Sequence, residues 1–324
     1  MASAGAATEA ARFVTGMPTV HIVGRGIVAQ RLQRMLQDRP IMVHDPRWAH
    51  VTGVQPGDVA VLAHGGAQAE TTPGLLRRGL HVVTVGEQIA DTTQLVATDA
   101  ATDGRTLVVG AAMSPGLAGL IARHLADQLA SIDEIHVSVH GTAGPSCARV
   151  HHRSLSGLAT GWHDGEWHDY VGGSGRELCW FPEPIGAMDC YRARTAVPLL
   201  LNRAFPDVDR ISGRRSARRR DRLTAWLPML SPPHHEGGIG ALRVEVRGVD
   251  EHGGRQCLIA GVAELVGTTA AATAAAFVTA LIEGRIPSGL IVAGAADLPT
   301  VDLLSRIQSF GVRLQEFTGV PQPS

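Results

Sequence analysis

The chain of 324 residues contains no lysine, so all 29 of its strongly basic residues are arginines. This absence excludes a Schiff-base mechanism and any other use of a catalytic lysine. The formal net charge is −1, which creates no overall field for nucleic acid or anionic lipid. No run approaches the roughly 20 apolar residues of a membrane span. We therefore expect neither nucleic acid nor a membrane as a partner.

Cysteine is scarce, with four residues and no CxxC pair: Cys147, Cys179, Cys190 and Cys257. This usage argues against a disulfide framework and a zinc site. The sequence His234-His235-Glu236 lacks ligand spacing fixed by a helix or strand, so no metal is expected there either. The first 17 residues lack the apolar core of an export signal and predict a disordered tail. The expected location is the cytoplasm.

Short β-type runs alternate with helical stretches from residue 18 to about residue 130. The expected strands are Thr19–Gly24, Ile41–Asp45, Asp58–His64, His81–Gly86 and Thr106–Ala111. They are mostly continuous apolar runs, as is typical of strands covered on both faces. The alternation therefore predicts an α/β domain over 18–130, with a doubly wound parallel sheet.

The pattern changes after a helix expected from about Gly116 to Leu129. Residues 133–141 alternate as a half-buried strand, and residues 241–264 predict a hairpin with its turn in Asp250–Gly254. These features favour a second, α+β domain over 131–284, built on a mixed or antiparallel sheet, for the substrate and for oligomerisation. The alanine-rich helix 267–284 and the C-terminal segment 285–324 are expected to pack back on the body of the protein.

The strongest local motif is GxGxxA over Gly24–Ala29, between an apolar strand and a helix. Gly24 permits a tight turn, Gly26 allows the backbone to approach a pyrophosphate, and Ala29 allows close helix packing. Asp45 ends the second strand, where a carboxylate can accept hydrogen bonds from the adenosine ribose. The motif predicts a dinucleotide-binding Rossmann domain. The alternative is a glycine turn in a non-binding domain, with Asp45 solvated.

The cofactor is expected to be NAD or NADP, with NAD slightly favoured. Asp45 repels a 2′-phosphate, whereas Arg47 offers a positive partner for one. Ligands of such folds bind at the carboxyl ends of the strands. The further cofactor-binding candidates are therefore Ile27, Val28, His64, Gly65, Gly66, Gly86, Glu87, Met113, Pro115 and Gly116.

With these motifs the chain resembles the saccharopine-dehydrogenase-like oxidoreductases over most of its length. In the first domain the resemblance rests on the GxGxxA turn and on TLVVGAAMSPGLAGLIARHLA (106–126). In the second it rests on GTAGPSCARVHH (141–152), DGEWHDYVGGSGRELCWFPEPIGAMDCYRA (164–193) and RRSARRRDRLTAWLPMLSPPHHEGG (214–238). The resemblance implies a Rossmann domain and an α+β domain with the substrate between them. Several relatives carry a lysine near the site, which this chain lacks.

Two polar groups in the irregular segment 142–240 are candidates for the substrate site. Histidine suits proton transfer near neutral pH, which makes His151 and His152 the expected proton donors. Purely structural hydrogen bonding is the alternative for each. Arginine forks suit a carboxylate or phosphate, so substrate binding is assigned to Arg176, Glu177, Glu183, Tyr191 and Arg192. The alternative for these residues is an internal network of arginines and carboxylates.

The densest charge is a run of six arginines within Arg214–Arg222. Without interleaved aromatics it favours a solvated face, or salt bridges in an oligomer, over nucleic-acid binding. A homodimer is the expected assembly. Cys179 and Cys190 have no supporting His and acid spacing, so buried packing is favoured over nucleophilic chemistry.

Together these features predict an NAD(P)-dependent oxidoreductase that moves a hydride to or from a C–O or C–N centre. The expected substrate is a small polar molecule that carries a carboxylate. The alternative is a non-catalytic dinucleotide-binding sensor or assembly subunit, which would bind the cofactor without consuming it.

Overall fold

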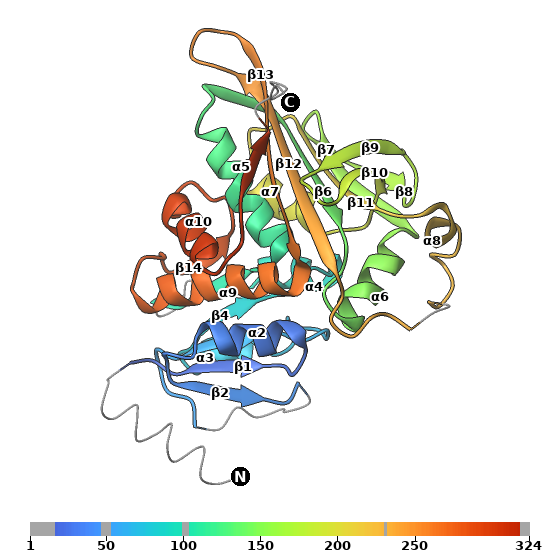
Figure 1. Cartoon of the computed structure of the whole chain (residues 1–324). Coiled ribbons are helices and arrows are strands. Elements are labelled where there is room, and N and C mark those ends of the chain that lie inside the picture. Colours follow the sequence, from blue (N-terminus) through green and yellow to red (C-terminus); the bar gives the residue numbers. More distant parts are fainter. Residues whose placement is uncertain (1–16, 47–52, 99–103, 230–231, 318–324) are drawn as a thin grey trace.

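The structure is a computed structural model that describes residues 17–46, 53–98, 104–229 and 232–317. Two sheets stand on either side of a long helix, with the N-terminal sheet below it and the second sheet above it in Figure 1. The first sheet is entirely parallel and the second is mixed. This arrangement confirms the predicted fold class.

The first sheet has six parallel strands in the order β14-β5-β4-β3-β1-β2. They are β1 (Val20–Val23), β2 (Ile41–His44), β3 (Val59–Leu62), β4 (His81–Thr84), β5 (Thr106–Val109) and β14 (Gly289–Val292). All residues of β1, β3 and β5 are buried, as their continuous apolar sequence predicts. The five expected strands are confirmed, and β14 adds a sixth from the C-terminal segment.

The helices between these strands follow the expected alternation. They are α2 (Ile27–Met35), α3 (Thr72–Arg77), α4 (Ile89–Val96) and α5 (Ala118–Ala126), the last preceded by the π-type turn η2 (Met113–Leu117). The chain runs from β1 to β2 on one side and then crosses to β3 on the other side of β1. The gap between β1 and β3 is thus the point where the strand order reverses, the usual place for a ligand.

The second sheet has nine strands, seven of them in the order β15-β13-β12-β6-β11-β10-β9, while β7 pairs with β11 and β8 pairs with β7. They are β6 (Ser131–His140), β7 (Leu158–His163), β8 (Glu166–Val171), β9 (Glu177–Phe181), β10 (Gly186–Arg192), β11 (Arg210–Ser216), β12 (Ile239–Val249), β13 (Arg255–Leu265) and β15 (Gln315–Phe317). β12 and β13 pair in register from Ile239 with Leu265 to Val249 with Arg255, which confirms the predicted hairpin.

The segment 142–240 is more regular than its sequence suggests. Besides β7 to β11 it contains the helices α6 (Pro145–Ser154), α7 (Val197–Ala204) and α8 (Arg219–Leu223). Some of its glycines and prolines lie in the short connections and others lie within the elements, such as Gly161 in β7, Pro198 in α7 and Gly213 in β11. The elements are short, so no long periodic pattern is visible in the sequence.

The helix between the two sheets is α9 (Val266–Ile282), which follows β13 of the second sheet and precedes β14 of the first. It packs beside α2 and against α10 (Thr300–Ser309), and it also contacts β3 and β4. The side chains of its alanines are small, so α9 can lie close to these neighbours. Six alanines of α9 have no exposed surface: Ala271, Ala272, Ala274, Ala275, Ala276 and Ala280.

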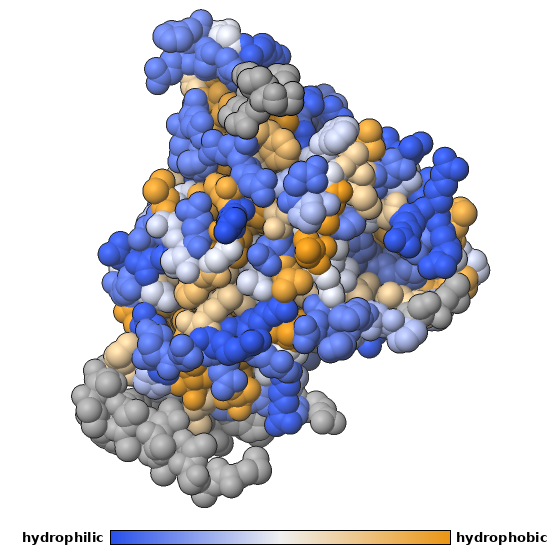
Figure 2. Space-filling view, in the orientation of Figure 1, coloured by the Kyte–Doolittle hydropathy of each residue, from blue (hydrophilic) through white to orange (hydrophobic). Residues whose placement is uncertain are grey.

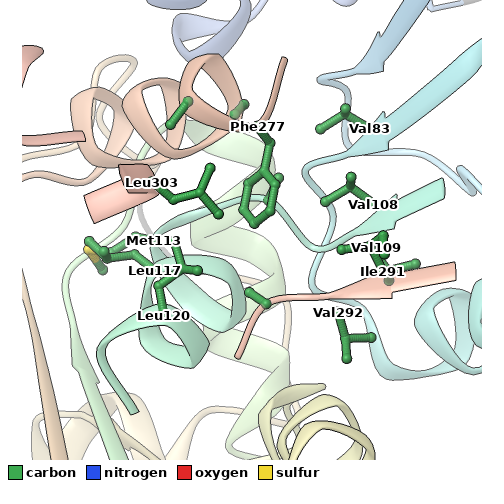
Figure 3. Close-up of a cluster of buried hydrophobic side chains, with 14 of the residues drawn as sticks. Val83, Val108, Val109, Met113, Leu117, Leu120, Phe277, Ile291, Val292 and Leu303 are labelled. Atoms are coloured by element: carbon green, nitrogen blue, oxygen red, sulfur yellow. The ribbon is translucent and has the colours of Figure 1, made fainter. Parts of the chain in front are cut away.

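We call the part of the molecule built on the parallel sheet the first half and the part built on the mixed sheet the second half. One continuous hydrophobic core extends through both halves. Figure 3 shows Phe277 of α9 directed toward Val83 and Val108 of the parallel sheet, with Leu303 of α10 beside it. Phe277 has no exposed surface. The packing of the two sheets against each other therefore depends on this helix.

We expect Phe277→Ala to lower the free energy of unfolding by about 3–5 kcal/mol, because it leaves a cavity in the centre of the core. The matched control is Val301→Ala on α10, where the side chain is exposed. Urea unfolding of both variants and the parent measures the effect. Equal midpoints for Phe277→Ala and Val301→Ala would contradict this description of the core.

Candidate functional site

A cavity of about 390 Å³ opens at the carboxyl ends of the parallel strands, between the two halves of the molecule. The first half contributes Arg25, Gly26, Ile27, Val28, Pro46, Ala63, His64, Gly65, Gly66, Val85, Gly86, Glu87, Gln88, Asp91, Ala112, Met113 and Ser114. The second half contributes Val139, Gly141, Ala143, Gly144, Pro145, Ser146, Cys147, Val150, Arg215, His235, Val266 and Ala270. The lining is mostly apolar with a few charged groups, as is typical of small-molecule sites.

The two glycines of the GxGxxA turn have different structural roles. Gly24 has a φ of +148°, and a Cβ there would lie 2.3 Å from the carbonyl oxygen of Ala63. Its N–H also donates to the carbonyl of His44. A Cβ on Gly26, by contrast, would meet nothing within 4 Å. Gly24 is therefore needed for the fold, and Gly26 leaves space open at the pocket.

The N-terminus of α2 forms the floor of this part of the pocket. Gly26 is its N-cap, has no side chain to cap the free N–H groups, and is followed by a first turn without acidic residues. Free N–H groups and the helix dipole favour an anion at such an end. The open space at Gly26 and the uncapped helix fit a dinucleotide pyrophosphate.

Asp45 follows β2 and lies beside the glycine turn. Its carboxylate is 3.5 Å from the guanidinium of Arg25, and Arg25 and the adjacent Pro46 both line the pocket. A ribose bound here would meet an acid and an exposed arginine together. Arg47 lies outside the described residues.

The loops after β3 and β4 complete the wall that the first half contributes. His64 accepts a hydrogen bond at Nδ1 from the N–H of Gly66, and burial lowers the pKa of His64. A Cβ on Gly65 would lie 2.6 Å from the Cβ of Ser146, so this loop touches the start of α6. The N–H of Gly86 donates to the side chain of Gln68.

Met113 lines the pocket after β5, whereas Pro115 and Gly116 lie behind the lining. A Cβ on Gly116 would be 2.7 Å from the carbonyl oxygen of Gly110, and the ring of Pro115 also packs against Gly110. The latter two residues therefore shape the turn η2, while Ser114 faces the pocket in their place.

The second half contributes a buried cation, Arg215 of β11. Its Nη2 forms an ion pair with Glu87, which follows β4 of the first half. Its Nη1 lies 2.9 Å from Nδ1 of His151. Its buried Nε has no hydrogen-bond partner among the described residues. The pocket thus contains a positive group that comes from one half and is neutralised by the other.

His151 is held as a neutral ring. Its Nε2 lies 3.1 Å from the carbonyl oxygen of Ser216, which accepts only, so Nε2 must be the donor. Nδ1 is then the acceptor for Arg215. Burial and the charge of Arg215 lower the pKa of His151 to about 3. Both ring nitrogens of His151 form hydrogen bonds within the protein, which does not favour the expected role of proton donor. These contacts instead indicate that His151 positions the guanidinium of Arg215.

Cys147, in the first turn of α6, also lies beside Glu87, with 4.0 Å between its Sγ and Oε1. Burial, together with the Glu87 charge, raises the pKa of its thiol to about 11. Cys147 is therefore a neutral thiol and a poor nucleophile at neutral pH.

The other expected substrate residues lie outside the lining of this pocket. The Nε2 of His152 donates to the carbonyl oxygen of Leu227, and His152 lines a smaller cavity. The remaining residues form surface or internal contacts. Arg176 pairs with Asp189, Glu177 pairs with Arg214, Glu183 is exposed, Tyr191 is buried, and Arg192 stacks on Tyr170. Two of these contacts are arginine–carboxylate pairs of the kind that the alternative interpretation named, and their members Arg176 and Glu177 are exposed.

The polar part of the wall from the second half instead includes the start of α6 and Arg215. Within the arginine run, Arg218 to Arg220 are exposed, and Figure 2 shows a strongly hydrophilic surface over the lobe that carries α8. Arg215 differs from these exposed arginines because it lies on β11, before α8, and its side chain is buried. Burial alternates along β11 from Arg210 to Arg215, which places the neighbouring Arg214 and Arg215 on opposite faces of the strand.

No helix in the described ranges combines the length and the apolar character that crossing a membrane requires. Within the same ranges no three His, Cys, Asp or Glu side chains are placed to hold a metal ion.

No protein-family model and no curated protein sequence matches the chain. Among solved structures, apo saccharopine dehydrogenase (L-Glu forming) from Saccharomyces cerevisiae matches with a TM-score of 0.63 and 13% identity, over 93% of this chain and 99% of that one. The chain has the fold of this saccharopine dehydrogenase. At this identity the match shows the shared fold and leaves function to the site itself.

Two further structures match more weakly. A meso-DAP dehydrogenase mutant with DAP from Clostridium tetani has a TM-score of 0.44 at 14% identity, over 88% of this chain and 95% of that one. GenD2 from gentamicin A biosynthesis, in complex with NAD, has a TM-score of 0.42 at 13% identity, over 93% of this chain and 97% of that one. Both are too distant to support an argument about this chain.

We expect the contribution of His151 to stability to depend on pH. Its pKa is about 3 in the folded chain against an ordinary value of 6.5, so the unfolded chain binds more protons between these values. Stability is therefore lost as the pH falls through this window. His151→Gln keeps a donor and an acceptor but cannot titrate. Its stability deficit relative to the parent should shrink between about pH 7.5 and about pH 5, measured by urea unfolding. A constant difference would contradict the neutral, buried ring.

Proposed function

We propose that the chain is an NAD(P)-dependent oxidoreductase that acts on a small carboxylate-bearing substrate, at a C–O or C–N centre. The observation that carries the proposal is that one pocket combines a helix end suited to a dinucleotide with a buried cation suited to a substrate carboxylate. The glycine turn and the uncapped end of α2 lie on one side, and the buried Arg215 lies on the other. The pocket is at the carboxyl edge of a parallel sheet, where such folds bind dinucleotides.

Each part of the pocket has a role in this proposal. The N–H groups after Gly26 hold the pyrophosphate, and Asp45 holds the adenosine ribose. The loops at His64 and Gly86 and the turn at Met113 border the nicotinamide. When bound, the dinucleotide supplies or accepts the hydride. Arg215 replaces Arg176 and Arg192 as the proposed anchor for the substrate carboxylate, because it is the buried guanidinium in the lining.

The turn predicts a sharp contrast between two glycine variants. Gly26→Val should abolish dinucleotide binding without lowering stability, because its side chain enters open space in the pocket. Gly24→Ala should lower stability instead, because its Cβ meets the Ala63 carbonyl. Calorimetric titration with NAD and NADP, alongside thermal unfolding, separates the two effects. Undiminished affinity in a folded Gly26→Val variant would remove the basis of the proposal.

Cofactor choice depends on Asp45 in this proposal, with NAD preferred. Asp45→Asn should narrow the preference for NAD over NADP by about tenfold, or about 1.4 kcal/mol, since it removes the repulsion of a 2′-phosphate. The ratio of the two dissociation constants in parent and variant measures this change. A parent protein that binds NADP more tightly than NAD would show that an arginine, Arg25 or Arg47, controls this end of the pocket.

The non-catalytic alternative shares the cofactor site. The two functions differ in turnover: an oxidoreductase consumes reduced dinucleotide when supplied with a suitable carbonyl or imine acid, and a sensor does not. Absorbance of the reduced nicotinamide, followed across a panel of such acids, decides between them.

A further inference from the structure

The ion pair between Arg215 and Glu87 joins the two halves of the molecule inside the pocket. Arg215 is 2% exposed and Glu87 is 16% exposed, so both charged groups are largely shielded from solvent. A buried charge is costly when it is left alone, whereas its exchange for another partner of equal charge is far less costly. Arg215 therefore requires an anion, and the pocket determines which anion can reach it.

Two features favour a second anion at this end of the pocket. The buried Nε of Arg215 has no hydrogen-bond partner among the described residues. In addition, α6 begins here with Gly144 as its N-cap, without a side-chain cap and without an acid in its first turn. Gly144 to Cys147 line the same pocket as Arg215. A guanidinium with an unused donor and an uncapped helix end together favour a carboxylate.

The neighbours of Arg215 leave Glu87 as its carboxylate partner in the pocket. His151 is neutral and accepts from Nη1, so it orients the guanidinium without neutralising it. Cys147 is a neutral thiol. Asp91, the other acid in the lining, accepts instead from the backbone N–H groups of Gln68 and Ala69.

We propose that Glu87 is an internal counter-ion that the carboxylate of the substrate displaces from Arg215. This inference rests on the proposed function, and it names the group that the substrate must carry. A neutral ligand of the same shape cannot make the exchange, because it would leave Arg215 without a negative partner. The ion pair thus selects carboxylates over their neutral counterparts.

The exchange has a consequence for Glu87. A carboxylate that loses its cation among apolar side chains is costly to keep charged, so Glu87 takes up a proton as it leaves. The titratable groups that face it are Arg215 from β11 and Cys147 from α6, with His64, Asp91 and His235 elsewhere in the lining. The protonated carboxyl group then stands beside the substrate. In a reduction, a bound reduced dinucleotide would supply the hydride for the substrate carbon, and Glu87 would give its proton to the oxygen or nitrogen, which yields an alcohol or an amine.

The test uses butyrate as the probe and butyramide as its neutral isostere, titrated calorimetrically into the full chain. Two buffers with different ionisation enthalpies report the protons taken up. The parent should bind butyrate in preference to butyramide, with uptake of about one proton for each butyrate bound. Glu87→Gln should bind butyrate about tenfold more tightly and without proton uptake, because the internal competitor is gone.

The matched control is Glu177→Gln, which removes the carboxylate partner of Arg214, the neighbouring arginine on the same strand. It should bind butyrate as the parent does. Weaker or unchanged binding by Glu87→Gln, or binding by the parent without proton uptake, would overturn the proposal. The parent measurements remain decisive if a variant does not fold. Since butyrate binding is measured without dinucleotide, a failure of the cofactor proposal would be seen separately.

Discussion

The arrangement of this protein depends on the close packing of α9 between two sheets. The helix follows β13 of the mixed sheet and precedes β14 of the parallel sheet, and it contacts strands of both sheets. Its alanines allow α2 and α10 to approach, and Arg31 of α2 donates to Thr268 of α9 at 2.9 Å. Larger side chains on this helix would separate the layers. The distance between the two walls of the pocket is therefore set by a row of small residues.

The pocket lies at one end of this interface, and the first turns of α9 take part in it. Val266 and Ala270 line the cavity beside the start of α6. At each end of the pocket a cation meets an anion: Arg25 with Asp45 near the glycine turn, and Arg215 with Glu87 across the two halves. Because these charges are balanced, an anionic ligand must compete with a carboxylate of the protein at either end. Such competition gives specificity more than affinity.

Most of the parallel-sheet half was predictable from the sequence, because five of its strands and the glycine turn each have a local signal. The GxGxxA turn and the five apolar runs are examples. The sixth strand, β14, was not visible, since its place beside β5 depends on the path of α9 over about twenty residues. For the substrate wall, the sequence prediction named the segment around Arg176 and Arg192, whereas the pocket is lined by the start of α6 and by Arg215. The segment around Arg176 and Arg192 has suitable residue types, but its arginines pair with Asp189 and stack on Tyr170. Arg215 belongs to an arginine run in the sequence, and only the burial pattern of β11 distinguishes it from Arg214.

A crystal structure of the chain with NAD tests the central claim most directly, because it locates both ends of the dinucleotide at once. The account predicts the pyrophosphate against the backbone of Gly26 to Val28, the ribose at Asp45, and the nicotinamide between Met113 and the pair of Glu87 and Arg215. A dinucleotide bound elsewhere, or saturating NAD that leaves this pocket without a ligand, would contradict it.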